Sequence, residues 1–264
     1  MGSATREALA GTRAALAGLG TVELRTADDL LAAARLIGRS PQLRSALIDN
    51  EADAAQKRAL VEGVFGARIG TEARGVLVSA ASARWSSQDD FLAGLEDLGF
   101  RLAAIAAGTS VELDSELFSF DRTVAGDAEL ELALGSKLGA AEAKERLVER
   151  LLGGVAAPAT VSIVRHLVLQ PRGRRIGEML KHAASVVADQ RGYDVATVTT
   201  AVPLTSDQLE RLGRTLAGTA GRGIRFDTIV DPSVLGGVRV QIGDDVIDGS
   251  VASRLSSLRQ KLAG

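Results

Sequence analysis

The 264-residue chain has no cysteine and very few aromatic side chains. The absence of cysteine excludes disulfides, thiolate nucleophiles and cysteine-ligated zinc sites. Aromatic residues make up 3% of the sequence, against 46% for hydrophobic residues as a whole. The core must therefore be built mainly from alanine, leucine and valine, and this composition favours helices that pack closely through small residues.

The chain also lacks a strong net charge and a long hydrophobic run. Its formal net charge of −2 predicts no general attraction to nucleic acid or to anionic membrane surfaces. The longest uncharged segment, Leu151–Val164, is too short to cross a bilayer and is interrupted by glycine and proline. The N-terminal segment lacks the continuous apolar stretch of a secretory signal. We therefore expect no direct insertion into a membrane.

Most of the chain, from about residue 5 to about residue 190, has the apolar spacing of successive amphipathic helices. Its second half repeats the first at a shift of 87 residues. For example, Lys57-x-x-Leu60-Val61-Glu62 in the first copy matches Lys144-x-x-Leu147-Val148-Glu149 in the second. Beyond Gly153 the copies are expected to drift by one or two residues. Chance similarity between alanine- and leucine-rich helices is the alternative explanation, but the shared order and spacing favour duplication.

The pattern changes after Arg191-Gly192. Tyr193–Val202 is rich in valine and threonine and predicts a strand. Thr205-x-x-Gln208 has the spacing of a capping box and opens a helix that Gly218–Gly223 is expected to end. A second alternating strand follows at Ile224–Val230. A helix between two strands favours a parallel pair.

These observations predict a mostly α fold, with a duplicated N-terminal helical bundle followed by a small C-terminal α/β domain. The first helical repeat is assigned to residues 1–107 and the second to residues 108–192, with the helix at 98–107 shared between them. The C-terminal domain is assigned to residues 193–264.

The last part of the chain carries the most specific signal. Asp231–Arg254 reads DPSVLGGVRVQIGDDVIDGSVASR, which predicts a tight hairpin with Gly236-Gly237 before its first strand, followed by a terminal helix. The order DPS-x-x-GGV-x-V-x-IGD-x-VIDGSV-x-x-RL resembles the C-terminal signature of the delta subunit of F-type ATP synthases. This family is the counterpart of the mitochondrial oligomycin-sensitivity-conferring protein. A generic hairpin and helix on an unrelated α+β domain is the alternative.

An ordinary delta subunit has one helical domain and one smaller α/β domain. The part of the chain from about Leu98 onward resembles that whole plan, so the first repeat is an extra module. Such enlarged delta subunits resemble those of high-GC Gram-positive bacteria. The resemblance leaves open which repeat grips the partner that a single-copy subunit holds.

The sequence offers few groups for catalysis or cofactor binding. His166 and His182 lack a metal-ligand spacing, and packing or surface positions are the simpler interpretation for both. No phosphate-binding G-x-x-x-x-G-K-[ST] loop is present. The basic segment Arg172–Arg175 is interpreted as a solvated loop that opens a helix, in preference to a nucleic-acid site. We predict no catalytic residue, cofactor or metal.

The resemblance implies a peripheral-stalk (stator) subunit on the cytoplasmic side of the cell membrane, held there through the ATP synthase complex. Its implied partners are the alpha subunits of the catalytic head and the b-type stalk subunit, and its implied role is to resist rotor torque. The family's groove between first and fifth helices points to five partner-binding candidates on the fifth helix of each repeat: Val76, Leu77, Ile163, Val164 and Leu167.

Two other functions compete with this interpretation. One is a helical-repeat adaptor unrelated to ATP synthase, in which duplication widens a binding surface. The other is an enzyme that acts on phosphorylated ligands through the Gly236-Gly237 loop.

Overall fold

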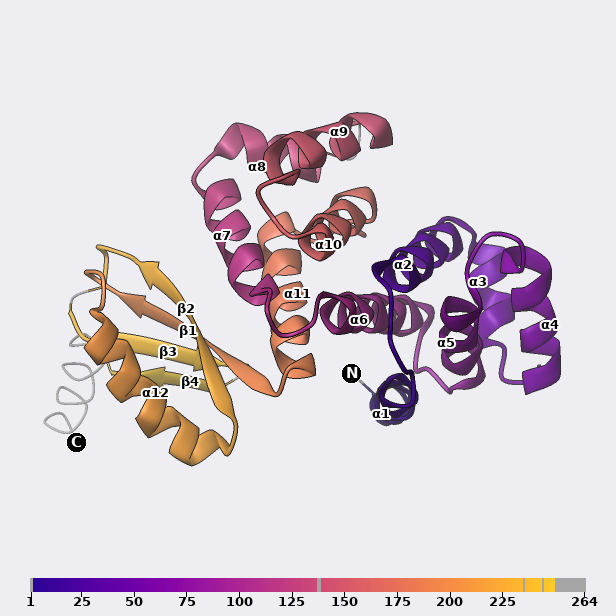
Figure 1. Cartoon of the computed structure of the whole chain (residues 1–264), viewed down its shortest axis with the longest axis horizontal. Coiled ribbons are helices and arrows are strands. Elements are labelled where there is room, and N and C mark those ends of the chain that lie inside the picture. Colours follow the sequence, from indigo (N-terminus) through magenta and orange to yellow (C-terminus); the bar gives the residue numbers. More distant parts are fainter. Residues whose placement is uncertain (1, 137–138, 235, 244, 250–264) are drawn as a thin grey trace, which may run out of the picture. The chain divides into compact units, whose positions relative to one another are not determined.

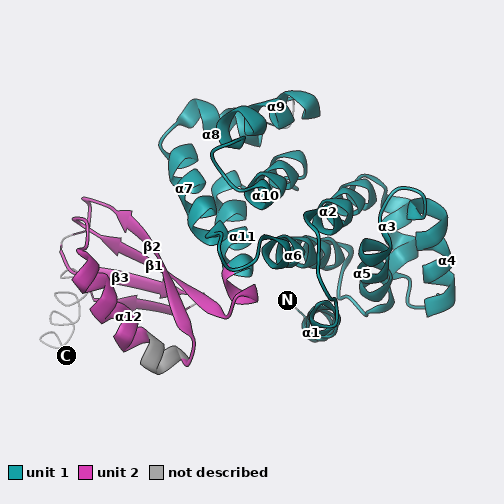
Figure 2. Cartoon of the chain, viewed as in Figure 1, with its two compact units in different colours: residues 1–187 teal, residues 188–264 magenta. Residues whose placement is uncertain are grey.

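The computed structural model describes residues 2–136, 139–234, 236–243 and 245–249. The chain divides into two compact units, residues 1–187 and residues 188–264 (Figure 2). The first unit is entirely helical in its described part. Its helices are α1 (Ser3–Ala17), α2 (Leu24–Arg39), α3 (Pro41–Ile48), α4 (Ala54–Phe65), α5 (Thr71–Ser82), α6 (Gln88–Ala107), α7 (Leu113–Ala125), α8 (Ala128–Gly135), α9 (Ala141–Leu152), α10 (Pro158–Leu169) and α11 (Ile176–Gln190), the last of which continues into the second unit.

The helix ends follow from local chemistry in the sequence. Ser40 precedes α3, where its hydroxyl accepts a hydrogen bond from the Leu43 amide at 3.3 Å and Pro41 occupies the first helical position. Asp53 and Gln56 form a reciprocal capping box at the start of α4. Gly66 lies at the end of that helix. The successive helices predicted from about residue 5 to about residue 190 are confirmed, α6 being the longest of those described.

Helix α6 is the centre of the first unit. Its side chains are buried all round from Gly94 to Ala104, and it contacts α1, α2, α3, α5 and α10 (Figure 1). A helix can be surrounded in this way only if some neighbours come very close. Gly94 makes room for the ring of Trp85, and Gly99 makes room for Leu31, because a Cβ atom at either position would collide with these side chains.

The two helical repeats correspond element by element. Helices α2 to α5 match α7 to α10, and the starts of α3, α4 and α5 are each separated from those of α8, α9 and α10 by the same 87 residues. The expected drift after Gly153 is therefore wrong for the fifth helix, because Thr71 and Pro158 open α5 and α10 at the unchanged shift. The connections before these helices have equal lengths, and only the side-chain identities differ.

The second unit contains a four-stranded mixed sheet with strand order β2-β1-β3-β4. The predicted parallel pair is confirmed, with Tyr193 opposite Gly223, and the hairpin of β3 and β4 is antiparallel. Ala196, Val198, Leu216 and Val240 form the core between α12 and the sheet. The elements of this unit are the strands β1 (Tyr193–Thr200), β2 (Gly223–Val230), β3 (Val238–Ile242) and β4 (Asp245–Asp248) and the helix α12 (Ser206–Ala220).

Details of the C-terminal predictions can be compared with this unit. The capping box is confirmed, since the Thr205 amide donates to Gln208 Oε1 at 2.8 Å and the Gln208 amide donates to the Thr205 hydroxyl at 3.3 Å. The predicted end of this helix within Gly218–Gly223 is confirmed, because α12 ends at Ala220 and Gly221 takes a positive φ of 68°. The predicted terminal helix lies outside the described residues.

Candidate partner-binding surfaces

The five residues predicted to bind a partner lie inside the first unit. Val76 and Leu77 on α5 are 5% and 0% exposed, and Ile163, Val164 and Leu167 on α10 are exposed by 1% or less. At the shift of 87 residues Val76 corresponds to Ile163 and Leu77 to Val164, so each repeat buries the same two positions. These side chains therefore lie in the core of the unit, beneath the exposed faces of α5 and α10.

The two repeats meet where α2 of the first repeat contacts α6 and α10 (Figure 1). Leu31 on α2 packs against Gly99 on α6. The contact with α10 is polar: the Ser162 hydroxyl donates a hydrogen bond to Asp28, and Arg35 Nη1 lies 3.2 Å from His166 Nδ1. Helix α2 thus covers the surface formed jointly by α6 and α10.

A buried charged cluster lies beside this contact. The Glu96 carboxylate on α6 is 1% exposed and accepts hydrogen bonds from Arg172 Nη2 at 2.6 Å and Arg174 Nη2 at 2.9 Å. His166 Nε2 lies 3.3 Å from the same carboxylate. The interpretation of residues 172–175 as a solvated loop is therefore wrong for Arg172 and Arg174. A buried carboxylate needs charged partners, and the sequence alone did not show that Glu96 would be buried.

The electrostatics of the cluster are set by burial and by the two arginines. Burial alone raises the pKa of Glu96, but the hydrogen bond from His166 and the charges around it bring that pKa down to about 2. Burial lowers the pKa of His166. A neutral imidazole can donate from Nε2 to Glu96 and accept from Arg35 at Nδ1, which agrees with the two contacts.

Asp97, the next residue on α6, binds a residue of repeat one on helix α1. Asp97 is 5% exposed and accepts hydrogen bonds from Arg13 Nη2 on α1 at 2.7 Å and from Arg101 Nε on its own helix at 2.6 Å. Neighbouring carboxylates on α6 thus bind residues of repeat two and of α1. The arrangement ties the repeats together.

Polar contacts within the two repeats are duplicated as well. Lys57 Nζ donates to the carbonyl of Ala81 at 2.8 Å, and Lys144 Nζ donates to the carbonyl of Val168 at 3.2 Å. Both lysines are nearly buried, and burial lowers the pKa of each ammonium group. Each lysine bonds to a carbonyl in the last turn of the fifth helix, where a cation is favoured.

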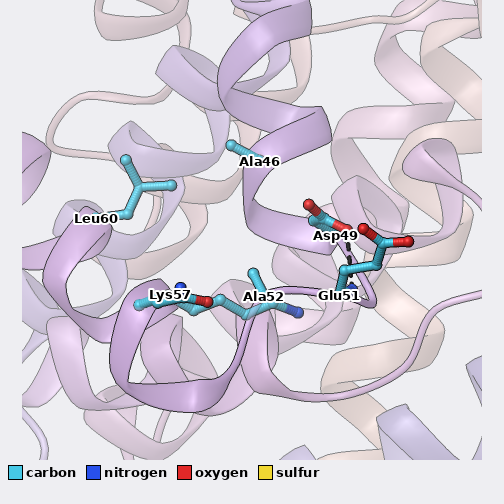
Figure 3. A pocket seen from close by; sticks show the side chains of 7 residues that line it. Ala46, Asp49, Glu51, Ala52, Lys57 and Leu60 are labelled. Atoms are coloured by element: carbon cyan, nitrogen blue, oxygen red, sulfur yellow. Dashed lines mark hydrogen bonds between the residues drawn. The ribbon is translucent and has the colours of Figure 1, made fainter.

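Lys57 also lines a hollow of about 450 Å³ between α3 and α4, with Ala46, Asp49 and Leu60 around it (Figure 3). A lysine of lowered pKa in a hollow resembles a reactive amine. Its hydrogen bond to Ala81 and the matching Lys144 contact in the other repeat indicate a structural role instead.

The second unit has a more apolar groove between α12 and β2, at an edge of the described sheet. It has a volume of about 530 Å³ and is lined in part by Leu209, Gly213, Ile224 and Phe226. The aromatic ring of Phe226 lies close to Gly213. An apolar groove beside a helix is suited to an amphipathic helix from a partner.

The described residues contain no group of histidine and carboxylate side chains arranged to hold a metal ion. Of the two histidines, His166 is held by Glu96 and Arg35, whereas His182 is exposed on α11. In the described part of the chain no helix combines the length and the apolarity needed to cross a membrane.

Comparison with known proteins assigns the chain to a family. Residues 100–262 match the family model described as "ATP synthase delta (OSCP) subunit". This match begins within α6 and therefore leaves the first five helices outside it.

Curated relatives match the whole length of the chain. ATP synthase subunit delta of Leifsonia xyli is 54% identical over 265 residues, covering all of both chains, and that of Streptomyces griseus is 37% identical over 271 residues with the same coverage. A chain of the Toxoplasma gondii mitochondrial ATP synthase hexamer is 21% identical with a TM-score of 0.42, over 64% of this chain and 98% of that one. The family model and the full-length relatives show that this chain belongs to the ATP synthase delta (OSCP) subunit family, as a non-catalytic peripheral-stalk subunit.

Proposed function

We propose that the chain connects the catalytic head of the ATP synthase, through its alpha subunits, to the b-type stalk subunit. The connection resists the torque of the rotor, so that proton flow is coupled to ATP formation. The observation that carries this proposal is the family relationship over the full length. The division of the chain into two compact units supports the proposal, because a connector needs a separate docking surface for each partner.

Head binding is assigned to the helical unit. A partner helix docks across a first and a fifth helix, with Val76 and Leu77 or Ile163, Val164 and Leu167 forming the buried layer beneath it. These side chains act by holding the fifth helix in place. Substitutions at these buried positions would unfold the repeat, so a loss of binding could not be separated from a loss of folding. Exposed neighbouring residues are therefore the better targets.

Stalk binding is assigned to the groove between α12 and β2 in the second unit, because this surface is apolar and open. The partner there is an amphipathic helix of the b-type subunit. The whole assembly lies at the cytoplasmic side of the cell membrane, and this chain is held there peripherally through its partners.

The test uses the full-length chain with two separate baits, the catalytic head and the extramembrane part of the b-type stalk. Leu209→Glu places a charge in the groove and is expected to weaken stalk binding at least tenfold while head binding is retained. Arg211→Gln makes the same change in net charge at an exposed position of α12 and should bind both baits normally. A wild-type chain that binds neither bait would overturn the proposed function.

A further inference from the structure

The surface covered by α2 in repeat two has a counterpart in repeat one. Helix α10 corresponds to α5 at a shift of 87 residues. Helix α6, which opens repeat two, corresponds to α1 at a shift of 88 residues through the shared pattern Gly-x-Arg, at Gly99 and Arg101 in α6 and at Gly11 and Arg13 in α1. The contacting pair α1 and α5 is thus the equivalent of the contacting pair α6 and α10.

In repeat two this pair is covered by a helix of the same chain. We call Gly99, Ser162 and His166 the closed seat, because Leu31, Asp28 and Arg35 of α2 lie against them. The burial is complete enough to define a helix-binding surface: Ser162 is 5% exposed and His166 is fully buried.

In repeat one the equivalent positions are Gly11, Gly75 and Ser79, which we call the open seat. Gly11 and Gly75 are exposed, and a Cβ atom added at either would meet no other atom within 4 Å. Ser79 is only partly buried. In repeat two the covering helix, α2, comes from repeat one.

We infer that the open seat binds a helix from a partner subunit in the position that α2 takes on the closed seat. This inference rests on the proposed function and specifies it: the first repeat, not the second, receives an alpha-subunit helix. The seat of the second repeat is already filled by α2.

The chemistry of the open seat defines its occupant. Where the closed seat has Ser162, His166 and Gln170 as polar anchors for α2, the open seat has Gly75, Ser79 and Ala83. Loss of the imidazole and the amide leaves a surface of small side chains. It therefore suits an amphipathic helix that presents leucine or isoleucine at helical spacing, as Leu31 does on Gly99. Binding should depend little on salt, because Gly75, Ser79 and Ala83 carry no charge.

The experiment fills the seat with a bulky side chain. Gly75→Trp and, separately, Gly11→Trp are introduced into the full chain, with Gly63→Trp as the matched control. Gly63 is also an exposed helical glycine with open space around its Cβ position, but it lies on α4, outside the seat. Binding to the catalytic head is measured by titration at low and high salt, and circular dichroism verifies the fold of each variant.

Both seat variants are expected to bind the head at least tenfold more weakly than the wild type, and the Gly63 variant is expected to bind normally. If folded seat variants bind like the wild type while the wild type does bind, the inference is overturned and the proposed function stands. If the wild type itself fails to bind the head, the proposed function fails and the inference fails with it.

Discussion

The charged cluster at the junction of the repeats allows a quantitative prediction for Glu96→Gln. The substitution keeps the size of the side chain and removes its charge, while Arg172 and Arg174 lose the carboxylate that they contact at 2.6 and 2.9 Å. Removing one partner of a buried ion pair costs about 3–5 kcal/mol. The two arginine side chains are 19% and 30% exposed and can turn toward water. The expected loss in the free energy of unfolding is therefore lower, about 2–3 kcal/mol.

The assay is urea and thermal unfolding followed by the fluorescence of Trp85, the only tryptophan. This side chain is 6% exposed, packs against Phe91 at the start of α6 and so reports on the helical unit. A loss of this size corresponds to a Tm lowered by roughly 5–10 °C in a unit of this length.

The control is Glu149→Gln, which removes the same charge from an ion pair with Arg165 whose side chains are 61% and 38% exposed. An exposed pair of this kind contributes little, so the change should stay within about 0.5 kcal/mol. If Glu96→Gln is no more destabilising than this control, the cluster does not hold the repeats together and our reasoning about the junction is wrong.

Two further predictions concern buried basic side chains. Because burial lowers the folded-state pKa of His166, the unfolded chain takes up a proton below about pH 6.5 that the folded chain does not, and stability falls on acidification. Between pH 7 and 5.5 this contributes about 1 kcal/mol. Unfolding measured at both pH values should show a smaller loss for His166→Gln than for the wild type, and an equal loss in the two chains would contradict the prediction. Lys57→Met and Lys144→Met each remove the donor to a last-turn carbonyl and should lower the free energy of unfolding by similar amounts, about 1 kcal/mol. Urea unfolding compares them with Lys181→Met, whose side chain is 47% exposed, and unequal effects of the two buried lysines would contradict the equivalence of the repeats.

Much of the fold could be predicted because local signals and tertiary structure agree. The helical part of the chain followed from its apolar spacing, and the C-terminal hairpin followed from alternating residues around glycine turns. The end of α12 within Gly218–Gly223 followed from the glycines themselves, because Gly221 can take the positive φ that closes the helix.

The surfaces were harder to predict because they depend on contacts between distant segments. Glu96 is 70 residues from His166 and 76 from Arg172, and periodicity along α6 does not show which of its faces are covered. A helix with neighbours on every side has no polar face to reveal its orientation. The five candidates on α5 and α10 were chosen as apolar residues on the fifth helices, and apolar residues are the ones a fold buries first.

The position of the two carboxylates explains how one helix can serve two repeats. Residues 96 and 97 are adjacent, so their side chains leave α6 about 100° apart around its axis. Glu96 consequently reaches α10 and the loop before α11, while Asp97 reaches α1. A flexible linker between the copies would yield under torque, but a shared helix fixed on two sides transmits it. In a peripheral-stalk subunit, the additional repeat can therefore lengthen the connector without adding a joint between the two helical repeats.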